Sequence, residues 1–233
     1  MRIDIVTGFP DIFQGPLTES VISRACASGK AEIVIHGLRD YAHDKHRTID
    51  DTPYGGGAGM ILKAQPIFEC CDRLLAERAY DDVILTTPQG VRYNQETANR
   101  FSLAENLLII CGHYKGVDQR VCDALVTREI SIGDYVTTGG EVAAIVLVDT
   151  IVRLIPGSIG DGESLLSDSF MEDHLDCAYY TKPAEYRGLE VPEDLLSGNL
   201  EKIETWRRND ALQKTSARRP DLLVRQSERS SAI

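Results

Sequence analysis

Short apolar runs that alternate with helical patterns constrain the fold of this 233-residue chain more than any other feature. Most of the runs have continuously apolar centres with polar residues chiefly at their ends, as in parallel strands that are covered on both faces. Their alternation with helical patterns over roughly the first 155 residues predicts an α/β domain with a parallel sheet. The predicted strands are Ile3–Val6, Glu32–His36, Asp82–Thr86, Asn106–Cys111 and Glu129–Ser131, and the predicted helices are Leu17–Ala27, Gln65–Glu77, Gln95–Phe101, Gln119–Val126 and Glu141–Leu154.

A change of composition after the last of these helices predicts a second domain. Residues 157–174 are polar and contain glycine, which indicates a linker that follows a first domain of residues 1–156. Asn199 can cap a helix that runs through Gln213. We therefore expect residues 175–233 to form a small helical domain.

The formal net charge of −11 argues against a nucleic-acid partner only until its distribution is considered. Residues 1–174 carry all of it, with 15 basic and 26 acidic residues, whereas residues 175–233 carry ten of each kind. Between Thr205 and Arg229 there are seven basic residues and three acidic ones. This run is typical either of a solvated helix face or of a surface that follows phosphate groups. Charge alone does not decide between the two.

The length of the apolar runs and the spacing of the cysteines bear on the cellular location of the protein. No apolar run approaches the roughly 18–20 residues that a membrane span needs, and the N-terminus is typical of a first strand, not of a signal peptide. We expect a soluble, cytoplasmic protein. The six cysteines include no C-x-x-C pair, so neither a metal nor a redox role is predicted for them.

Three glycine-bearing turns that follow predicted strands are the first candidates for a binding site. They are Pro88–Gly90, Gly112–Asp118 and Gly133–Glu141. In open α/β sheets, ligands bind outside the carboxyl ends of the strands, and glycine lets the backbone approach a ligand closely. Each turn alone is typical of an ordinary strand-to-helix connection, but the three together predict one shared pocket. None matches the G-x-G-x-x-G or G-x-x-x-x-G-K-[ST] pattern.

A polar stretch before the second helix holds further candidates. His43 and His46 stand near Asp44, Asp50 and Asp51, but zinc usually needs a second pair of ligands, so no metal site is predicted. The triplet of Lys45, His46 and Arg47 is better interpreted as an anion-contacting surface. It precedes a glycine-rich loop, residues 55–59, that lacks the lysine of a phosphate-binding loop.

The order of several motifs carries a specific resemblance. The chain resembles the bacterial tRNA (guanine-37-N1)-methyltransferases of the SPOUT superfamily over nearly its whole length. The matching stretches are Phe9-Pro10, Asp44-Lys45-His46-Arg47-Thr48, Pro53-Tyr54-Gly55-Gly56-Gly57-Ala58-Gly59-Met60, Pro88-Gln89-Gly90, Cys111-Gly112-His113-Tyr114-Lys115-Gly116-Val117-Asp118-Gln119-Arg120, Ile132-Gly133-Asp134-Tyr135-Val136, Thr138-Gly139-Gly140-Glu141, Arg153-Leu154-Ile155-Pro156-Gly157 and Asp168-Ser169-Phe170.

The resemblance implies a fold and a ligand that composition does not reveal. It implies a deep C-terminal trefoil knot, against the usual rule that chains do not knot, and a homodimer with its active sites at the subunit interface. It also implies S-adenosylmethionine as the methyl donor, bound in a bent shape by the knot turns. The implied contacts are Pro88, Gly90, Gly112, Tyr114, Gly116, Ile132, Gly133, Asp134, Tyr135, Val136, Thr137 and Gly140.

The resemblance also assigns roles that the pattern does not. The sequence pattern alone indicates that Asp168 is a solvated carboxylate in the linker and that Arg153 is a cation at a helix C-terminus. By resemblance, Asp168 is the general base and Arg153 stabilises charge on the guanine O6. Arg207 and Arg208, with Lys45, His46 and Arg47, are expected to contact the tRNA.

Departures from the family pattern lie near the donor turns. Lys115 stands where many relatives carry a glutamate, so the resemblance leaves a magnesium requirement open. Thr137, Ala143 and Ala58 replace a more usual leucine, proline and proline. Two other interpretations remain: a different SPOUT RNA methyltransferase, which modifies a ribose or another base, and a non-catalytic RNA-binding protein. A dinucleotide-dependent oxidoreductase is set aside because its glycine fingerprint is missing.

Overall fold

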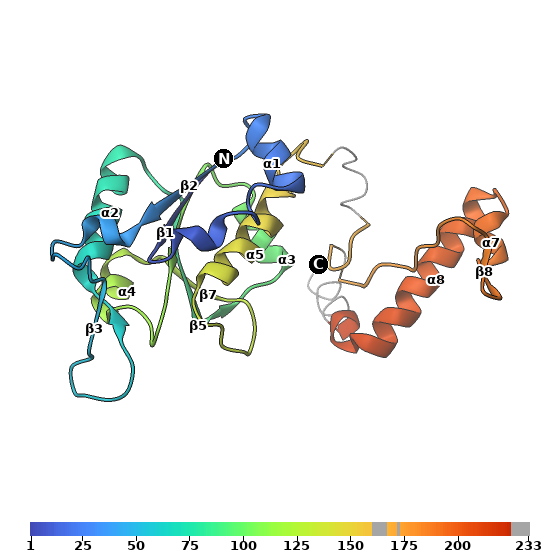
Figure 1. Ribbon diagram of the computed structural model, residues 1–233. Helices are drawn as coiled ribbons and strands as arrows, with labels where there is room; N and C mark the ends of the chain where they lie inside the picture. The colour runs from blue at the N-terminus through green and yellow to red at the C-terminus, as the bar shows by residue number, and fades with distance from the viewer. Residues whose placement is uncertain (160–166, 172, 225–233) are drawn as a thin grey trace, which may run out of the picture. The chain divides into compact units, whose positions relative to one another are not determined.

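The five strands predicted from the apolar runs form one parallel sheet. The computed structural model describes residues 1–159, 167–171 and 173–224. The strand order is β2-β1-β6-β5-β7, and every neighbouring pair is parallel (Figure 1). The strands are β1 (Arg2–Thr7), β2 (Glu32–Gly37), β5 (Asp82–Arg92), β6 (Asn106–Cys111) and β7 (Arg128–Ser131). The predicted α/β class with a parallel sheet is confirmed.

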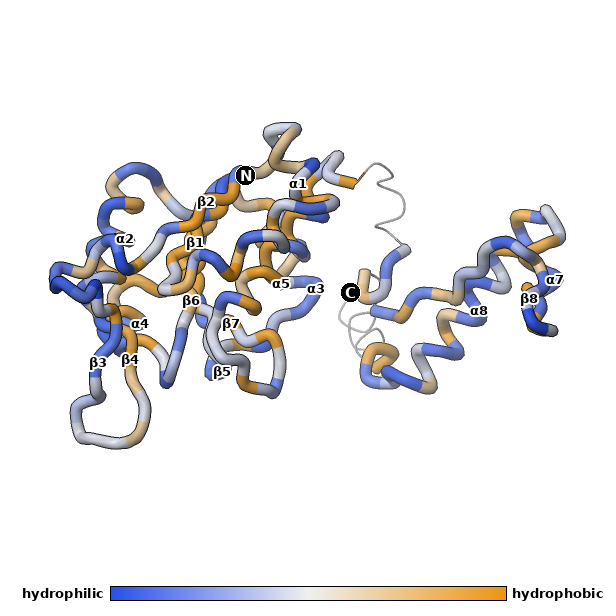
Figure 2. The backbone as a smooth tube through the Cα atoms, in the orientation of Figure 1, coloured by the Kyte–Doolittle hydropathy of each residue, from blue (hydrophilic) through white to orange (hydrophobic). Residues whose placement is uncertain are grey.

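Helices cover both faces of this sheet, as continuously apolar strands require. Because successive side chains of a strand point to opposite faces, Leu107 and Ile109 of β6 join one core cluster and Leu108 and Ile110 join the other. The first cluster includes residues of α1 (Ser20–Ala27), α3 (Gln95–Phe101) and α5 (Glu141–Val152). The second includes residues of α2 (Ala64–Glu77) and α4 (Gln119–Leu125). Figure 2 shows the apolar strands enclosed between the two helical layers.

Short elements complete the first part of the chain. They are the 3-10 helices η1 (Pro10–Phe13) and η2 (Leu38–Tyr41), and an antiparallel pair of β3 (Asp50–Asp51) with β4 (Ile61–Leu62). The glycine-rich loop of residues 55–59 connects β3 to β4, where Figure 1 shows a long excursion of the chain.

Two boundaries differ from the prediction for identifiable reasons. β5 does not end at Thr86 but continues to Arg92 through an irregularity, because Thr86 and Val91 both pair with Ile130 of β7. The predicted turn Pro88–Gly90 is therefore a bulge inside a longer strand. Helix α1 begins at Ser20 and not at Leu17, since the amide and hydroxyl groups of Thr18 both donate to the Gly15 carbonyl in a separate turn.

The chain divides into two compact units, residues 1–160 and 161–233. The second contains a small hairpin of β8 (Glu185–Tyr186) and β9 (Leu189–Glu190), then α7 (Glu193–Leu196) and α8 (Leu200–Arg218). The Asn199 side chain accepts hydrogen bonds from the amides of Glu201 and Lys202, which confirms the predicted cap. Helix α8 continues past Gln213 to Arg218.

In the three described ranges, no helix combines the length and the apolar character needed to cross a bilayer. All six cysteines are free thiols, and Cys70, Cys71 and Cys111 are fully buried.

Candidate active site

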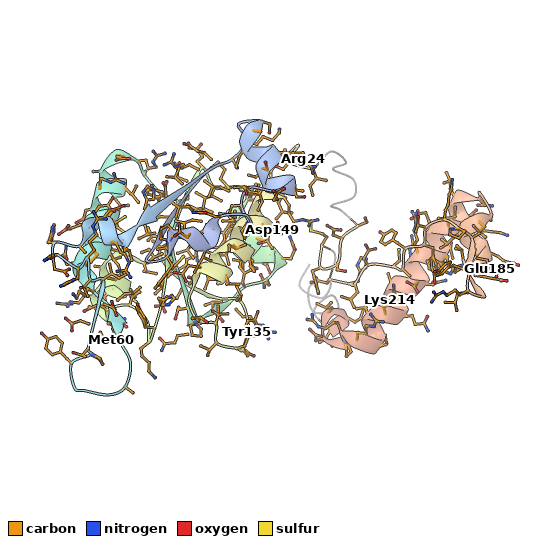
Figure 3. The ribbon with its side chains drawn as sticks, in the orientation of Figure 1. Arg24, Met60, Tyr135, Asp149, Glu185 and Lys214 are labelled. Atoms are coloured by element: carbon orange, nitrogen blue, oxygen red, sulfur yellow. The ribbon has the colours of Figure 1, made fainter. Side chains whose placement is uncertain are left out.

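The three predicted glycine-bearing segments meet around one cavity of about 330 Å³. It lies near the carboxyl end of β6, beside the β5 bulge and the turn after β7. Met60 and Tyr135, both labelled in Figure 3, lie along this edge of the first unit in that view. The predicted donor contacts that line the cavity are Pro88, Gly112, Tyr114, Gly116, Ile132, Tyr135, Val136, Thr137 and Gly140.

Gly90, Gly133 and Asp134, the other three predicted contacts, are not among the residues that line it. A side-chain carbon on Gly90 would enter the backbone of β7 at Glu129 and Ile130, so this glycine lets the bulge lie against its neighbour. Asp134 is largely exposed, with its carboxylate 3.9 Å from the Arg92 guanidinium. A direct contact of these three residues with a ligand stays a prediction.

The turn after β7 returns to the end of β6, two strands away in the sheet. There the Gly140 amide donates to the Gly112 carbonyl at 2.6 Å, and His113 and Gly139 form an isolated antiparallel bridge. A side-chain carbon on Gly140 would collide with the Thr86 hydroxyl, which lies 3.2 Å from the Gly140 carbonyl. Only glycine permits this close approach, which forms one wall of the cavity.

The Gly112–Asp118 turn is anchored from the other side by β4 and the residue before it. The Leu62 amide donates to the Gly116 carbonyl at 3.0 Å, and the Lys115 amide donates to the Met60 carbonyl at 3.1 Å. The Asp118 amide donates to the Leu62 carbonyl at 3.0 Å. Residues 113–117 are thus held rigidly, although Tyr114 adopts a left-handed backbone conformation with φ 58°.

A buried acid stands behind the cavity wall, and the pattern did not single it out. Glu141, the first residue of α5, is 1% exposed and accepts a hydrogen bond from the Thr7 hydroxyl at 2.8 Å. Its second oxygen lies 3.3 Å from Nδ1 of His113, whose ring is 4.2 Å from that of Phe9. The helix N-terminus favours a negative charge here. The only sequence signal was an acid at a helix start, which is too common to be specific.

Thiol chemistry is disfavoured at this site. Cys122 lines the cavity, and burial raises the pKa of its thiol. Burial also raises the pKa of Cys111, at the end of β6, well above the ordinary value, and the nearby Glu141 adds to this shift. Both thiols therefore stay protonated near neutral pH, so neither is a ready nucleophile.

Arg153 and Asp168 are not among the described residues that line the cavity. Arg153 follows the last residue of α5, and its amide donates to the Asp149 carbonyl. Glu141, beside the cavity, begins the same 12-residue helix, so the two ends are roughly 18 Å apart at 1.5 Å per residue. Asp168 belongs to the second unit, in a turn where its carbonyl accepts from the Met171 amide.

The residues predicted to contact tRNA are exposed on both units. Lys45, His46 and Arg47 follow η2, in a turn fixed by the Asp44 carboxylate, which accepts from the amides of His46 and Thr48. Asp40 lies 3.4 Å from the Arg47 guanidinium.

Arg207 and Arg208 are exposed on α8, and Arg207 pairs with Glu204 at 2.9 Å. Arg225 and Arg229, from the predicted basic run, lie outside the described residues. His43 pairs with Glu69, and the described residues include no group of three or more His, Cys, Asp or Glu side chains that could hold a metal ion.

Comparison with known proteins gives one consistent result. Residues 1–225 match the family described as tRNA (Guanine-1)-methyltransferase TrmD. The chain is 50% identical over 229 residues to a tRNA (guanine-N(1)-)-methyltransferase of Chlorobaculum tepidum, an alignment that covers 98% of this chain and all of that protein. It is 54% identical over 223 residues to proteins of the same name from Christiangramia forsetii and Bacteroides thetaiotaomicron, with 96% of this chain and 99% of each relative covered.

Proposed function

Because this chain belongs to the tRNA (guanine-1)-methyltransferase family over almost its whole length, we propose that its cavity binds S-adenosylmethionine for methylation of guanine 37 in tRNA. The protein is a tRNA (guanine-N1)-methyltransferase that modifies the base next to the anticodon. The observation that carries the proposal is the convergence of three glycine-bearing segments on one cavity in a chain of this family.

The cavity fits the donor in size and in chemistry. Its volume of about 330 Å³ is within the range of roughly 300–1,000 Å³ for small-molecule sites. Glycines at positions 112, 116 and 140 let the backbone wall approach a ligand without intervening side chains, and Ile132, Tyr135, Val136 and Thr137 form another wall. The bound donor supplies a methyl group that its sulfonium already activates.

Asp168 acts on the guanine and Arg153 on the charge that develops there. N1 of guanine is mostly protonated at neutral pH, so a base must remove its proton as the new bond forms. A solvated carboxylate is a weak base, and desolvation by bound RNA strengthens it. Negative charge then spreads to O6, where the Arg153 guanidinium stabilises it. The Asp168 segment completes the site when tRNA binds.

The positions of the two ends of α5 support a homodimer. The cavity and Arg153 lie at opposite ends of this helix, which favours a site completed by the Arg153 of a second copy. The same helix exposes Val142 and Val146, with the half-buried Ile145 between them. An apolar stripe at this spacing is typical of a helix that packs against a partner. A second copy would cover the stripe and supply its own Arg153.

The path of the chain around the cavity supports the trefoil knot. After the edge strand β7, the backbone passes β5 and returns to the end of β6, where Gly140 and Gly112 are hydrogen bonded. It then continues as α5 against the face formed by β1, β6 and β5. A C-terminal segment that returns in this way among the earlier turns is what a knot at the donor site requires.

The tRNA contacts follow from charge and from the domain arrangement. In this proposal residues 1–156 form the knotted donor-binding domain, residues 157–174 form the linker that carries Asp168, and residues 175–233 form the helical tRNA-binding domain. Arg207 and Arg208 grip the anticodon stem, while Lys45, His46 and Arg47 lie nearer the guanine. The enzyme acts in the cytoplasm, where its tRNA substrate is found.

Transfer of labelled methyl groups to an unmodified tRNA transcript tests the function. The wild-type enzyme should yield N1-methylguanosine, and Asp168→Ala should lower kcat by about 10²–10⁴-fold, as expected for loss of a general base. Binding of S-adenosylhomocysteine should not change. Asp173→Ala is the matched control from the same segment and should stay within a few-fold of wild type.

Three results would contradict the proposal. A ribose-methylated product would favour another RNA methyltransferase, and full activity of Asp168→Ala would remove the assigned base. A protein that binds tRNA but transfers no methyl group would be a non-catalytic RNA-binding protein.

A further inference from the structure

Few charged side chains line the donor cavity, and one of them has no oppositely charged partner among the residues that the structure describes. Lys115 is the only lysine or arginine among the described residues that line the cavity, and Glu129 is the only aspartate or glutamate there. The Lys115 side chain is exposed and forms no ion pair within the described ranges. The imidazole of His113, in contrast, faces the buried Glu141 carboxylate.

The backbone and stem of Lys115 are held in place at the cavity wall. Its amide donates to the Met60 carbonyl, and the neighbouring Gly116 carbonyl accepts from Leu62. Its aliphatic stem lies across Gly59, where an added side-chain carbon would be 2.9 Å from Cγ and 3.2 Å from Cε of the lysine. The glycine-rich loop therefore leaves a groove for this lysine, which restricts the ammonium group to the rim of the cavity.

We propose that the Lys115 ammonium binds the carboxylate at the amino-acid end of the methyl donor and thereby selects donors that carry this group. The inference rests on the proposed function, because it takes S-adenosylmethionine as the ligand. That molecule has one anionic group, its carboxylate, while its adenosine is neutral and its sulfonium and amino groups are cationic. A cation fixed on the cavity wall is therefore attracted to one end of the donor and repelled by the reacting sulfur, which orients the molecule.

A comparison of two ligands isolates this contact from every other. The ligands are S-adenosylhomocysteine and its decarboxylated analogue, which keeps the adenosine, sulfur and amino groups. Their affinities are measured by calorimetry on the wild type, Lys115→Met and Lys115→Arg. Loss of a charge-assisted contact should weaken S-adenosylhomocysteine binding to Lys115→Met by about 10-fold, while the analogue binds both proteins equally. Lys115→Arg, which keeps the charge, should recover most of the affinity.

Lys202→Met is the matched control, since it removes the same charge from an exposed position on α8 outside the cavity lining. It should leave the affinity for both small ligands unchanged. Raising the salt concentration should narrow the difference between wild type and Lys115→Met, because screening weakens a contact at the rim.

The outcomes separate the two proposals. Wild-type protein that binds neither ligand would refute the donor site itself. If the wild type binds S-adenosylhomocysteine and Lys115→Met binds it equally well, the lysine inference alone is wrong. Equal losses for both ligands would show a general distortion of the cavity and would also overturn it. If Lys115→Met instead weakens only tRNA binding, the ammonium contacts a phosphate and not the donor carboxylate.

Discussion

The two units of the chain bury their apolar side chains to very different extents. Both core clusters belong to the first unit, where the strands and five long helices enclose side chains that are almost entirely inaccessible. In the second unit, the 19-residue helix α8 buries only Ala211 and Thr215, and Leu212 is 45% exposed. The first unit can hold a site by its own packing, whereas the second depends more on polar contacts.

Polar contacts also differ between the units. In the first, Asp4 of β1 is fully buried and accepts hydrogen bonds from Arg2 and Tyr80, with the His36 ring 2.7 Å away. In the second, Asp210 of α8 is partly exposed and accepts from Lys214 and from the Ala178 amide. The Asp4 carboxylate thus organises a buried network inside the first unit. The Asp210 carboxylate holds the segment around Ala178 against α8 near the surface of the second unit.

Removal of an apolar side chain should show the difference most strongly. Leu147→Ala deletes a fully buried side chain of α5 and should destabilise the first unit by about 3 kcal/mol, within the range for buried leucines. Leu212→Ala should cost no more than about 0.5 kcal/mol, as for surface positions. Hydrogen exchange of peptides from β6 and α8 reads the two units separately. If Leu147→Ala and Leu212→Ala caused equal losses of hydrogen-exchange protection in their own units, the predicted difference in burial between the units would be wrong.

The two carboxylates should respond differently to acid. Burial alone would raise the pKa of Asp4, but His36, Arg2 and Tyr80 lower it well below its usual value on balance. A lowered folded-state pKa gives stability that is fully present above the unfolded value of about 4 and is lost progressively as the pH falls from there through the lower folded-state pKa. Asp4→Asn should therefore cost about 3 kcal/mol at pH 7, as for a broken buried pair, and about 1 kcal/mol less at pH 3, roughly one unit below the unfolded pKa.

Asp210→Asn removes the corresponding carboxylate from the second unit. Burial raises the pKa of Asp210, but Lys214 and the Ala178 amide lower it by more, so that on balance it lies below the ordinary value. Its stabilisation runs in the same direction with pH, but the side chain is 22% exposed. We expect a loss of at most about 1 kcal/mol, as for pairs near the surface. Urea unfolding across this pH range measures both variants, and a larger effect for Asp210→Asn would reverse the ranking.

Charge reversal on α8 should affect RNA binding and leave the donor site intact. Arg207→Glu with Arg208→Glu should weaken tRNA binding by about 10-fold and lower the dependence of affinity on salt. Binding of S-adenosylhomocysteine should stay the same. Lys202→Glu, on the same helix but outside the basic run, is the control and should change tRNA affinity by less than about 2-fold. Unchanged tRNA affinity in the double variant would remove α8 from the interface.

Sequence patterns predicted the elements better than the contacts between them. Each predicted strand and helix of the first 155 residues forms, because burial on both faces of a parallel sheet leaves a strong apolar signature. The extension of β5 to Arg92 was not predicted, because a proline and a glycine resemble a turn when the partner strand is unknown.

Side-chain contacts between residues far apart in the sequence were not predicted. Thr7 and Glu141 are 134 residues apart and yet share a buried hydrogen bond, and no local pattern pairs them. Asp4 similarly meets Tyr80, 76 residues away. The turns around the cavity were predicted because glycine marks them locally, whereas the roles proposed for Arg153 and Asp168 came only from the family resemblance.

The separation of the cavity and Arg153 at the two ends of α5 predicts how mixtures of two inactive variants should behave. Gly140→Ala should spoil the cavity and Arg153→Ala should remove the arginine, so each purified variant should be nearly inactive. In the proposed homodimer, a hybrid of the two variants should restore one complete catalytic centre, because the undamaged cavity and the undamaged arginine would come from different copies. Random exchange of subunits should then recover about a quarter of the normal activity. Activity would not recover in the mixture of the two variants if a single polypeptide supplied both the cavity and the arginine.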